Sequence, residues 1–424
     1  MAEKFIIEGE KPLEGEIEVR GSKNAAGAIL AATLLTSEEC VIDNLPLVSD
    51  ILNLIDILKE MGAEIEWLEK RKVKIRAGKR IDLKKLDFEK ISKSRVSVLL
   101  IGALLPRVKE FRFSRPGGDR IGLRPIDTHL NALRELGAEI EEAGDFYYLK
   151  SKQLKGKEIV LPEFSVTTTE NLIMASVFAE GETIIKLAAQ EPQVQDLILI
   201  LNKMGAKIEG NRTHTLKIQG VKRLKGVEHR IIPDPNEAGT FLTIGAAAAK
   251  KLLVKDLIPE HLDIFLLKLK EAGVNFIRKG DNSIEIYKPE KLFPTKIQAL
   301  PYPGFLTDIL PLIIPLLTQA EGKSLIHDTH YENRLNFIHQ LRKMGADIEI
   351  IDPHRAIIFG PTPLTGVTIE SWDIRAGAAL VMAGLMAQGK TIIENVEQID
   401  RGYERIEERL QKLGANIKRV KSEV

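Results

Sequence analysis

Cysteine is almost absent from this sequence, since Cys40 is the only one among 424 residues. A single cysteine excludes an intrachain disulfide and argues against a zinc site built from cysteine ligands. It lies within the stretch EECVIDNL. We expect Cys40 to be a small core residue rather than a reactive thiol.

An excess of charge of either sign is missing as well. The 61 Lys and Arg residues are balanced by 60 Asp and Glu residues, so the broad basic surface of a general nucleic-acid binder is absent and any anion site must be local. The opening stretch MAEKFIIEGEKPLEGE is too charged for a signal peptide, and the longest apolar runs, such as ILPLIIPLLT, are short and interrupted by proline. We expect a soluble, cytoplasmic protein that binds neither nucleic acid nor membranes.

Motifs for common cofactors are also missing. The sequence has no Walker motif and no glycine-rich dinucleotide motif, and no spacing of His, Asp or Glu residues suggests a metal site. The functional residues are therefore expected within the repeated pattern that the sequence does contain.

One unit recurs six times along the chain. Each copy has an amphipathic stretch, such as ILNLIDILKE or THLNALREL, followed by a motif of the type MGAEIE and then by an alternating stretch. The glycine of this motif is typical of a left-handed helix end, and the alternation predicts a strand. These glycines recur at intervals of 68 to 75 residues and are Gly62, Gly137, Gly205, Gly273, Gly345 and Gly414.

Every unit also contains a second helical stretch that is small and apolar on nearly all sides, such as NAAGAILAATLL or RAGAALVMAGLMA. A helix without a polar face belongs in an interior. The sequence therefore predicts an α/β fold with buried helices at the centre of each domain, amphipathic helices nearer the solvent and sheets outside. Six units suggest two domains of three units each. The least repeat-like stretch, LKGVEHRIIPDPNEAG, predicts the hinge, whereas the opening strands fit either domain.

Polar residues gather where the buried helices are expected to begin. Free N–H groups and the positive end of the helix dipole make such starts natural anion sites, and Lys23, Arg95 and Arg375 add full charges there. If a pseudo-rotation relates the three units of a domain, their helix starts face one region, and two such regions across a hinge form a cleft that can close. The six starts are Gly21–Asn24, Ser92–Arg95, Ser165–Asn171, Pro233–Thr240, Tyr302–Asp308 and Trp372–Arg375.

Three loops ahead of amphipathic helices are equally rich in polar residues, and they span residues 115–127, 330–334 and 398–406. Arg124, Arg334 and Arg401 in these loops could each grip phosphate or carboxylate oxygens with two N–H groups, as lysine cannot. A single arginine of this kind is more often a solvated charge. The recurrence of basic residues at equivalent points of repeated units favours anion binding.

Several of these residues also have plain structural interpretations. GSKN is by itself a serviceable helix N-cap, and Asp308 taken alone would be an ordinary acid in a first helical turn. Asp234, between two prolines at the expected hinge, fits a structural role as well as a functional one. His129 is expected to lie on a helix surface rather than to act as a base.

Six stretches follow one another along essentially the whole chain, and the last of them is called the closing motif. They are GSKNAA, PGGDRIGLRPID, PGFLTD, YENR, DIRAGAALVMAG and IDRGYERIEERLQKLGANI. In this order they resemble the family of UDP-N-acetylglucosamine 1-carboxyvinyltransferases. The closing motif and the PGG loop together are specific, whereas GSKN is shared loosely with the sister enzyme that makes 5-enolpyruvylshikimate 3-phosphate.

The resemblance implies two inside-out α/β barrel domains of the enolpyruvyl transferase fold, each built from three repeated α/β units with buried helices. It implies an N-terminal domain with the catalytic loop at residues 22–232. The C-terminal domain would comprise residues 1–21 and 233–424, which includes the opening strands. The hinge would lie near residues 20–22 and 230–235.

The resemblance also implies a transferase reaction. The enolpyruvyl group of phosphoenolpyruvate would move to the 3'-hydroxyl of UDP-N-acetylglucosamine with release of phosphate, in the first committed step of peptidoglycan synthesis. These two small molecules are the expected partners, and neither a metal nor an organic cofactor is expected. Such an enzyme would act in the cytoplasm and serve cell-wall biogenesis, cell shape, the cell cycle and cell division.

Site residues follow from the resemblance residue by residue. Catalytic roles fall to Asp119, Asp308, Lys23 and Arg401, with Asp308 as the base that takes the 3'-hydroxyl proton. Phosphoenolpyruvate would be held by Lys23, Asn24, Arg124, Arg334, Arg375 and Arg401. The UDP-sugar would contact Asn24, Arg95, Arg124, Pro125, Ile126, Asp127, Thr128, Ser165, Val166, Thr167, Asp308 and His330.

This chain departs from the family pattern in two places. The family commonly has a lysine just before the SV of the third unit and a glycine just after it, where this chain has Phe164 and Thr167. The binding of the uridine phosphates is therefore expected to differ in detail. Asp119 occupies the place of the usual cysteine, the thiol that fosfomycin alkylates, although some family members carry aspartate there.

Asp119 raises the question of when a carboxyl can act as an acid. A free carboxyl loses its proton near pH ~4, and Arg115, Arg120 and Arg124 would favour the ionised form if they came close. A bound dianionic substrate and the exclusion of water would favour the protonated form. We therefore hypothesise that Asp119 becomes a competent acid only in the closed, substrate-loaded complex, where it protonates the enol or assists the departure of phosphate.

Two other functions stay open on the sequence. One is enolpyruvyl transfer to shikimate 3-phosphate, and the other is a non-catalytic protein of the same fold that senses a sugar nucleotide. The intact set of Lys23, Asp119, Asp308 and Arg401 argues against a non-catalytic protein.

Overall fold

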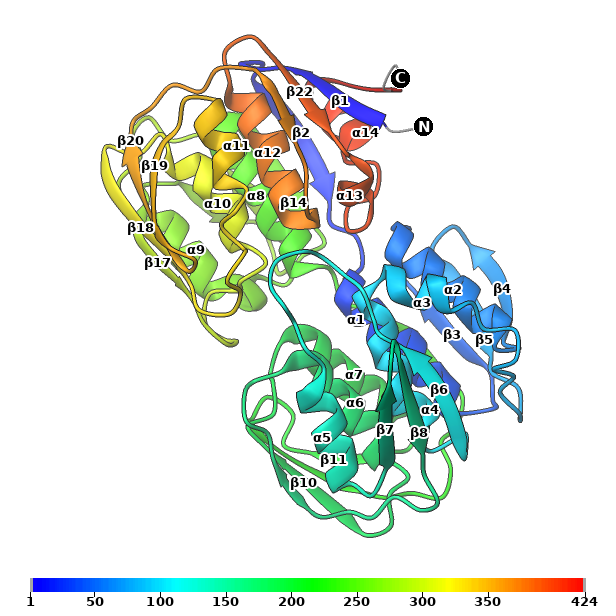
Figure 1. Cartoon of the computed structure of the whole chain (residues 1–424). Coiled ribbons are helices and arrows are strands. Elements are labelled where there is room, and N and C mark those ends of the chain that lie inside the picture. Colours follow the sequence, from blue (N-terminus) through cyan, green and yellow to red (C-terminus); the bar gives the residue numbers. More distant parts are fainter. Residues whose placement is uncertain (1–2, 422–424) are drawn as a thin grey trace. The chain divides into compact units, whose positions relative to one another are not determined.

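The computed structural model describes residues 3–421 (Figure 1). The chain folds into two compact units. The C-terminal unit consists of Met1–Arg20, Asp119–Leu123 and Pro233–Val424, and the N-terminal unit consists of Gly21–Gly118 and Arg124–Ile232. The short segment 119–123 thus belongs to the C-terminal unit, although the chain on both sides of it belongs to the N-terminal unit.

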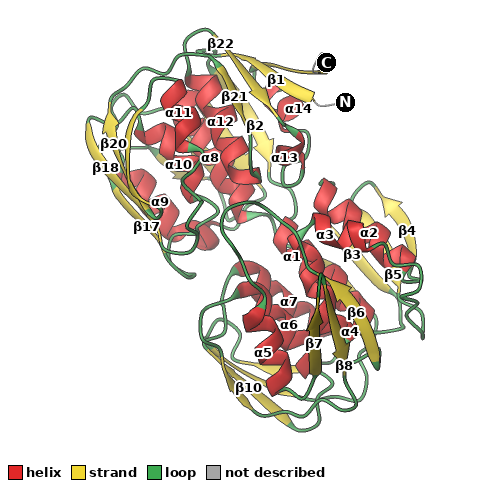
Figure 2. Ribbon diagram, viewed as in Figure 1, coloured by secondary structure: helices red, strands yellow, loops and turns green. Residues whose placement is uncertain are grey.

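The N-terminal unit has three separate sheets around its helices (Figure 2). One sheet has the order β13-β3-β5-β4, formed by Val227–Arg230, Cys40–Asp43, Lys72–Arg76 and Glu64–Glu69. A second has the order β11-β12-β10-β9, formed by Lys207–Glu209, Thr215–Gln219, Glu182–Lys186 and Glu158–Val160. The third has the order β6-β8-β7, formed by Glu110–Ser114, Phe146–Lys150 and Glu139–Ala143.

The C-terminal unit also has three separate sheets. One has the order β21-β22-β1-β23, formed by Thr368–Glu370, Lys390–Glu394, Glu3–Glu8 and Asn416–Lys421. A second has the order β15-β16-β14-β2, formed by Phe276–Arg278, Ser283–Ile286, Ala249–Lys255 and Leu13–Glu18. The third has the order β17-β18-β20-β19, formed by Lys296–Ala299, Gly322–Asp328, Arg355–Gly360 and Asp347–Asp352.

Buried helices occupy the interior of both units, as the sequence predicts. In the N-terminal unit they are α1 (Lys23–Ala32) with the 3₁₀ turn η1 (Thr33–Leu35), α4 (Leu99–Leu104) preceded by the 3₁₀ turn η2 (Arg95–Val98), and α6 (Val166–Ser176). In the C-terminal unit they are α8 (Pro235–Ala248), α10 (Leu310–Leu317) and α12 (Ile374–Met386), which pack against one another. Thirteen of the 14 residues of α8 are buried, which leaves no polar face for solvent.

The remaining helices are mostly amphipathic. They are α2 (Ser49–Glu60), α3 (Phe88–Lys93), α5 (Asp127–Glu135), α7 (Pro192–Lys203), α9 (Asp263–Glu271) with η3 (Pro259–Leu262), α11 (Ile338–Lys343), α13 (Glu397–Asp400) and α14 (Ile406–Gln411). Six of them end just before the repeated glycines. All six glycines have φ between 87° and 105°, which is the left-handed region that favours glycine. The predicted helix ends are therefore confirmed.

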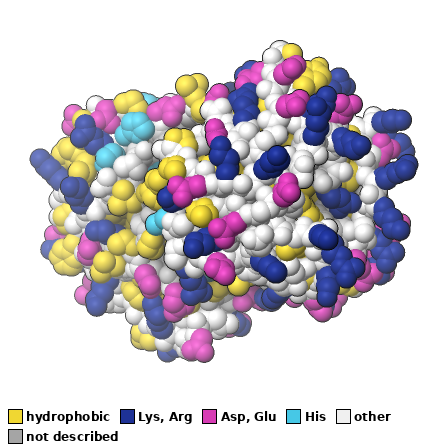
Figure 3. Space-filling view, turned by 90° about the horizontal axis from the view of Figure 1, so that it is seen from below, with side chains coloured by type: hydrophobic (Ala, Val, Ile, Leu, Met, Phe, Trp, Pro, Cys, Tyr) yellow, Lys and Arg dark blue, Asp and Glu magenta, His cyan; other side chains and the backbone are white. Residues whose placement is uncertain are grey.

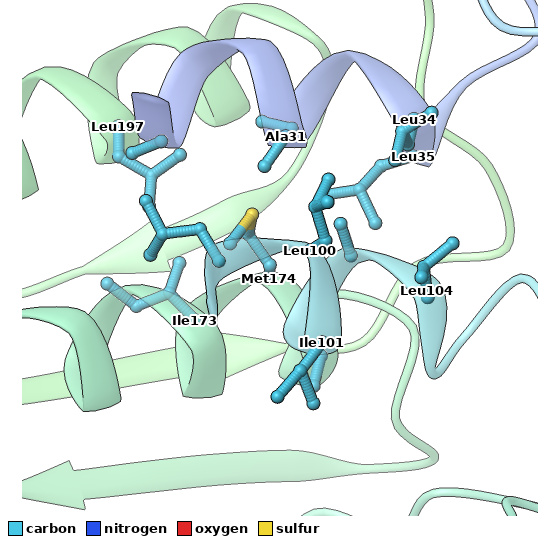
Figure 4. Close-up of a cluster of buried hydrophobic side chains, with 14 of the residues drawn as sticks. Ala31, Leu34, Leu35, Leu100, Ile101, Leu104, Ile173, Met174 and Leu197 are labelled. Carbon is cyan, nitrogen blue, oxygen red and sulfur yellow. The ribbon is translucent and has the colours of Figure 1, made fainter. Parts of the chain in front are cut away.

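Each unit has its own hydrophobic core. In the N-terminal unit, Ala31 and Leu34 from the first buried helix, Leu100 from the second and Met174 from the third belong to one cluster (Figure 4). The C-terminal unit has a second, separate core. Cys40 is fully buried in the first core, and burial raises the pKa of its thiol to about 11. It is a core residue, as expected, and not a reactive thiol.

The opening strands belong to the C-terminal unit. Strand β1 pairs antiparallel with both β22 and β23, and β2 pairs parallel with β14. Where the chain returns to this unit, Asp234 caps α8 by accepting hydrogen bonds from the backbone N–H groups of Asn236 and Glu237, at 2.8 and 3.4 Å. Asp234 therefore has the structural role that its position between prolines allowed.

Charged side chains of both signs are interspersed over the face of the molecule shown in Figure 3. Among residues 3–421, no helix is long and apolar enough to span a membrane. The same part of the chain holds no group of three or more His, Cys, Asp or Glu side chains arranged to bind a metal ion.

Candidate active site

Asp308 lies between two buried arginines of the C-terminal unit. Its Oδ1 accepts a hydrogen bond from Nη2 of Arg334 at 2.8 Å, and its Oδ2 accepts one from Nε of Arg375 at 3.4 Å. The two arginines are 1% and 3% exposed, whereas the Asp308 side chain keeps 30% of its surface exposed. Because α10 begins only at Leu310, Asp308 precedes the helix and is not the ordinary first-turn acid that was the alternative.

The neighbouring carboxylates keep these arginines charged. Burial alone would disfavour the charge on Arg334, but the carboxylates of Asp308, Asp373 and Asp328 outweigh it and raise its pKa above the usual value. Asp373 is itself buried at the start of α12, where it accepts hydrogen bonds from the backbone of Arg375 and Ala376, both at 2.8 Å. Burial raises the pKa of Asp373. Asp373 therefore caps α12 at Arg375 and supplies a negative charge near Arg334.

Two buried N–H groups of these arginines have no hydrogen-bond partner among the described residues. They are Nε of Arg334, which is 3.8 Å from Oδ2 of Asp328, and Nη1 of Arg375. The Arg375 guanidinium also lies 5.3 Å from the ring centre of Tyr403, whose pKa is raised by burial. Buried donors are nearly always paired in proteins, by protein atoms, water or a ligand. These two donors are therefore suited to an anion.

Asp328 organises the loop that carries the next site residues. Its Oδ1 accepts hydrogen bonds from the backbone N–H groups of His330 and Tyr331, at 2.8 and 3.0 Å, and its Oδ2 accepts one from the Thr307 hydroxyl at 2.5 Å. The residue is completely buried at the end of β18. One carboxylate thus fixes the backbone of the His330–Arg334 loop and the residue just before Asp308.

Asp119 forms an ion pair with Arg401. Oδ1 of Asp119 lies 2.5 Å from Nη1 of Arg401, and both side chains are 15% exposed. Arg401 also donates to Oε1 of Gln398 at 3.1 Å. The carboxylate of the PGG loop and the arginine of the closing motif are therefore brought together within the C-terminal unit.

Lys23 is the first residue of α1 in the N-terminal unit, and Ser22 caps that helix by accepting from the Ala25 N–H at 3.3 Å. Nζ of Lys23 lies 2.7 Å from Oδ2 of Asp50, at the start of α2, and both side chains are less than one-tenth exposed. The GSKN motif is thus a helix cap that also holds a buried cation. Asn24 follows on the same helix and is partly exposed.

Arg95 binds the backbone of the loop that contains Arg124. Its Nη1 donates to the Arg124 carbonyl at 2.7 Å, and its Nη2 donates to the Pro125 carbonyl at 3.2 Å. Arg124 has a φ of 47°, in the left-handed region, and a Cβ on Gly118 would lie 3.1 Å from its Nη1. The two hydrogen bonds from Arg95 thus hold the loop backbone at Arg124, the residue with this left-handed conformation.

The starts of α5 and α6 lie close together in the N-terminal unit. Thr128, next to Asp127 at the first turn of α5, donates to Oε1 of Glu163 at 3.1 Å. Thr167, in the first turn of α6 after Val166, has its hydroxyl 2.8 Å from Nε2 of His129. Two further residues of the set, Ser165 and Ile126, precede the two helices as their N-cap positions.

His129 is not on a helix surface, so that expectation is wrong. The residue is 2% exposed, and burial, together with the nearby Arg95, lowers its pKa to about 3. The imidazole is therefore neutral and joins α5 to α6 through Thr167. Phe164, just before Ser165, packs edge-on against the His214 ring with centroids 4.7 Å apart.

The buried state of His129 predicts a loss of stability in acid. A histidine in the unfolded chain titrates near pH ~6.5. Between that pH and about pH 3, the unfolded state therefore binds a proton that the folded state does not bind. Stability from this group is complete above pH ~6.5 and falls as the pH falls, by up to ~2 kcal/mol at pH ~5. The free energy of unfolding in urea, measured at pH ~6.5 and at pH ~5, should fall less between these values for His129→Gln than for the unmodified protein. Replacement of the exposed His339 by Gln should leave the pH dependence unchanged, and an equal loss in all three proteins would contradict the assignment.

The structure thus groups the predicted residues into separate clusters. The C-terminal unit joins Asp308 to Arg334 and Arg375, and it joins Asp119 to Arg401. The N-terminal unit joins Arg95 to the Arg124 loop. Sequence reasoning missed Asp50, Asp328 and Asp373, and the only signal for them was their position at a helix start or a strand end, which many structural acids share.

Comparisons with known proteins extend over nearly the whole chain. The family model of EPSP synthase (3-phosphoshikimate 1-carboxyvinyltransferase) matches residues 7–410. UDP-N-acetylglucosamine 1-carboxyvinyltransferase 1 of Carboxydothermus hydrogenoformans is 44% identical over 421 residues, which cover 99% of each chain. The UDP-N-acetylglucosamine 1-carboxyvinyltransferase of Koribacter versatilis is 44% identical over 425 residues, covering 99% of this chain and 96% of that protein.

Among solved structures, the enolpyruvyl transferase NikO from Streptomyces tendae superposes with a TM-score of 0.91 at 24% identity, and all of both chains is covered. The fold is therefore that of the enolpyruvyl transferases, as the sequence predicts. The relatives at 44% identity narrow the assignment further. This chain is a transferase that belongs to the family of UDP-N-acetylglucosamine 1-carboxyvinyltransferases.

Proposed function

We propose that this chain transfers the enolpyruvyl group of phosphoenolpyruvate to the 3'-hydroxyl of UDP-N-acetylglucosamine and releases inorganic phosphate. The observation that carries the proposal is Asp308, a partly exposed carboxylate held between the buried Arg334 and Arg375. The Asp308 carboxylate would be the base, and it contacts two arginines that each keep one buried N–H group without a hydrogen-bond partner among the described residues. Such an arrangement suits a reaction that deprotonates a hydroxyl beside a phosphorylated substrate.

In this proposal, the cations of the site bind phosphoenolpyruvate. Lys23, Asn24, Arg124, Arg334, Arg375 and Arg401 would contact its phosphate and carboxylate groups. The UDP-sugar would bind Asn24, Arg95, Arg124, Pro125, Ile126, Asp127, Thr128, Ser165, Val166, Thr167, Asp308 and His330. The Thr167 hydroxyl, bound to His129, adds a polar group where the family commonly has glycine.

The proposed reaction has two steps. Asp119 protonates the enol methylene, which leaves a cationic carbon, and the 3'-hydroxyl attacks that carbon as Asp308 takes its proton. The Asp119 carboxylate then takes a proton back from the methyl carbon of the tetrahedral adduct, the double bond forms again and the C–O bond to phosphate breaks. Lys23 and Arg401 stabilise the negative charge that develops on the departing phosphate. No metal or organic cofactor takes part in this scheme.

The same proposal sets the biological role. The reaction would be the first committed step of peptidoglycan synthesis in the cytoplasm, so that cell-wall biogenesis, cell shape, the cell cycle and cell division would depend on it. Nucleic acid would not be a partner.

A phosphate-release assay tests the proposal. The protein mixed with phosphoenolpyruvate and UDP-N-acetylglucosamine should release phosphate in an amount equal to the enolpyruvyl sugar nucleotide formed, as measured by mass spectrometry. Release with shikimate 3-phosphate but not with UDP-N-acetylglucosamine would assign the sister reaction instead. Tight binding of the sugar nucleotide without any release would indicate a non-catalytic sensor.

A further inference from the structure

Backbone groups of the segment 119–123 make two hydrogen bonds with the loop 330–334 of the C-terminal unit. The Ile121 carbonyl accepts a hydrogen bond from the Asn333 N–H at 3.0 Å, and the Leu123 N–H donates to Oε1 of Glu332 at 2.8 Å. The Leu123 side chain is 92% exposed, whereas Ile121 is 4% exposed. The Leu123 side chain therefore does little to seat the segment, and its amide does so through Glu332.

Gly122 leaves room for the Glu332 carboxylate at this contact. A Cβ on Gly122 would lie 2.5 Å from Oε2 and 3.1 Å from Oε1 of Glu332, closer than any side chain could approach without movement. The pKa of Glu332 is lowered by a hydrogen bond from its own backbone N–H and then by the bond from Leu123. The carboxylate is thus an ionised acceptor that reaches the backbone at a position where only glycine fits unchanged.

Glu332 also lies in the same short loop as two proposed substrate residues. His330 and Arg334 flank it, and Asp328 fixes the backbone of this loop. At the other end of the segment, Asp119 meets Arg401 at 2.5 Å. Glu332, which accepts from Leu123, and Arg401, which pairs with Asp119, therefore hold the two ends of the segment.

We propose that Glu332 is a positioning residue that seats segment 119–123 and thereby places the Asp119 carboxyl for proton transfer. The residue touches no reacting atom in this scheme and acts only through the Leu123 amide. The catalytic part of the inference rests on the proposed function, whereas the seating of the segment does not.

Hydrogen exchange on the full chain without substrates tests the seating directly. In Glu332→Ala, the amides of fragments that cover residues 115–126 should exchange roughly ten- to a hundredfold faster, because a hydrogen bond to a charged acceptor is lost. Glu332→Gln keeps an oxygen acceptor and should show a smaller change. Replacement by Ala of Glu349, an exposed carboxylate on β19 of the same unit, should change nothing. Unchanged exchange in Glu332→Ala would overturn the proposal.

Turnover tests the consequence. The kcat of Glu332→Ala should fall by roughly ten- to a hundredfold, with a smaller change in KM for phosphoenolpyruvate, and the far-UV spectrum and Tm should stay near those of the unmodified protein. Gly122→Ala should cause a similar loss by displacing the carboxylate, and the double variant should lose little more than either single one. A fall in kcat with unchanged exchange, or losses that multiply in the double variant, would overturn the positioning role. Faster exchange in a protein that releases no phosphate with any substrate would sink the proposed function and leave the seating in place.

Discussion

Replacement of Asp119 by Asn is expected to abolish turnover, whereas replacement by Cys should preserve it. Asn has nearly the same shape as Asp but carries neither a transferable proton nor the charge that pairs with Arg401 at 2.5 Å. A positioned general acid typically contributes roughly 10²–10⁴-fold to a rate, so kcat should fall at least about a hundredfold. The Cys variant would carry the thiol that the family resemblance implies at this position, and it should retain phosphate release and become sensitive to fosfomycin.

Binding measurements separate this chemical effect from misfolding. Asp119→Asn should bind phosphoenolpyruvate at least as tightly as the unmodified protein, because it removes a carboxylate that competes for Arg401. Asp145→Asn, at an exposed turn between β7 and β8, serves as the control and should keep full activity. Full activity of Asp119→Asn would show that the loop carboxylate is only a charge on the surface of the site.

Binding of phosphoenolpyruvate should also be coupled to uptake of a proton. In the structure, Asp119 already occupies Arg401, which is one of the cations proposed to hold that substrate. A dianion that takes over Arg401 leaves Asp119 beside negative charge and without its cation, and both changes favour the protonated carboxyl. The heat of binding at pH ~7 should therefore differ between buffers with different ionisation enthalpies. Equal heats in all buffers would mean that Asp119 gains no proton at this step.

The repeat architecture could be predicted because its signals are local. A helix end in the left-handed region strongly favours glycine, so Gly62 and Gly414 mark the same structural event wherever they lie in the chain. Helices without a polar face, such as α8 and α12, can only be buried. Both signals depend on the chemistry of neighbouring residues and not on distant contacts, and both were confirmed.

The partners of the site residues could not be predicted in the same way. Lys23 and Asp50 meet because α1 and α2 pack side by side, and no spacing in the sequence encodes that distance. For His129 the sequence predicted exposure, but the residue is buried. A polar residue in an amphipathic helix looks solvated, yet its ring is covered at the contact with Thr167 on α6. The sequence identified the candidate residue types, and tertiary packing determines their partners and orientation.

Replacement of Asp308 by Asn should separate catalysis from substrate binding. Turnover should fall by roughly 10²–10⁴-fold if the carboxylate is the base for the 3'-hydroxyl. Binding of phosphoenolpyruvate should become tighter, because Arg334 and Arg375 lose an internal anion that lies 2.8 and 3.4 Å away. Single-turnover phosphate release and calorimetric titration measure the two effects separately.

Stability should change much less than activity in this variant. Removal of one partner from a fully buried ion pair costs about 3–5 kcal/mol, but the Asp308 side chain is 30% exposed, and Arg334 keeps Oδ2 of Asp328 at 3.8 Å. Asp352→Asn, which breaks a partly exposed aspartate–arginine pair on β19 and β20 of the same unit, is the matched control and should affect neither turnover nor binding. Loss of turnover with equally weakened phosphoenolpyruvate binding would make Asp308 an organiser of the arginines and not the base, because only a carboxylate that competes with the substrate for these cations can be removed with a gain in affinity.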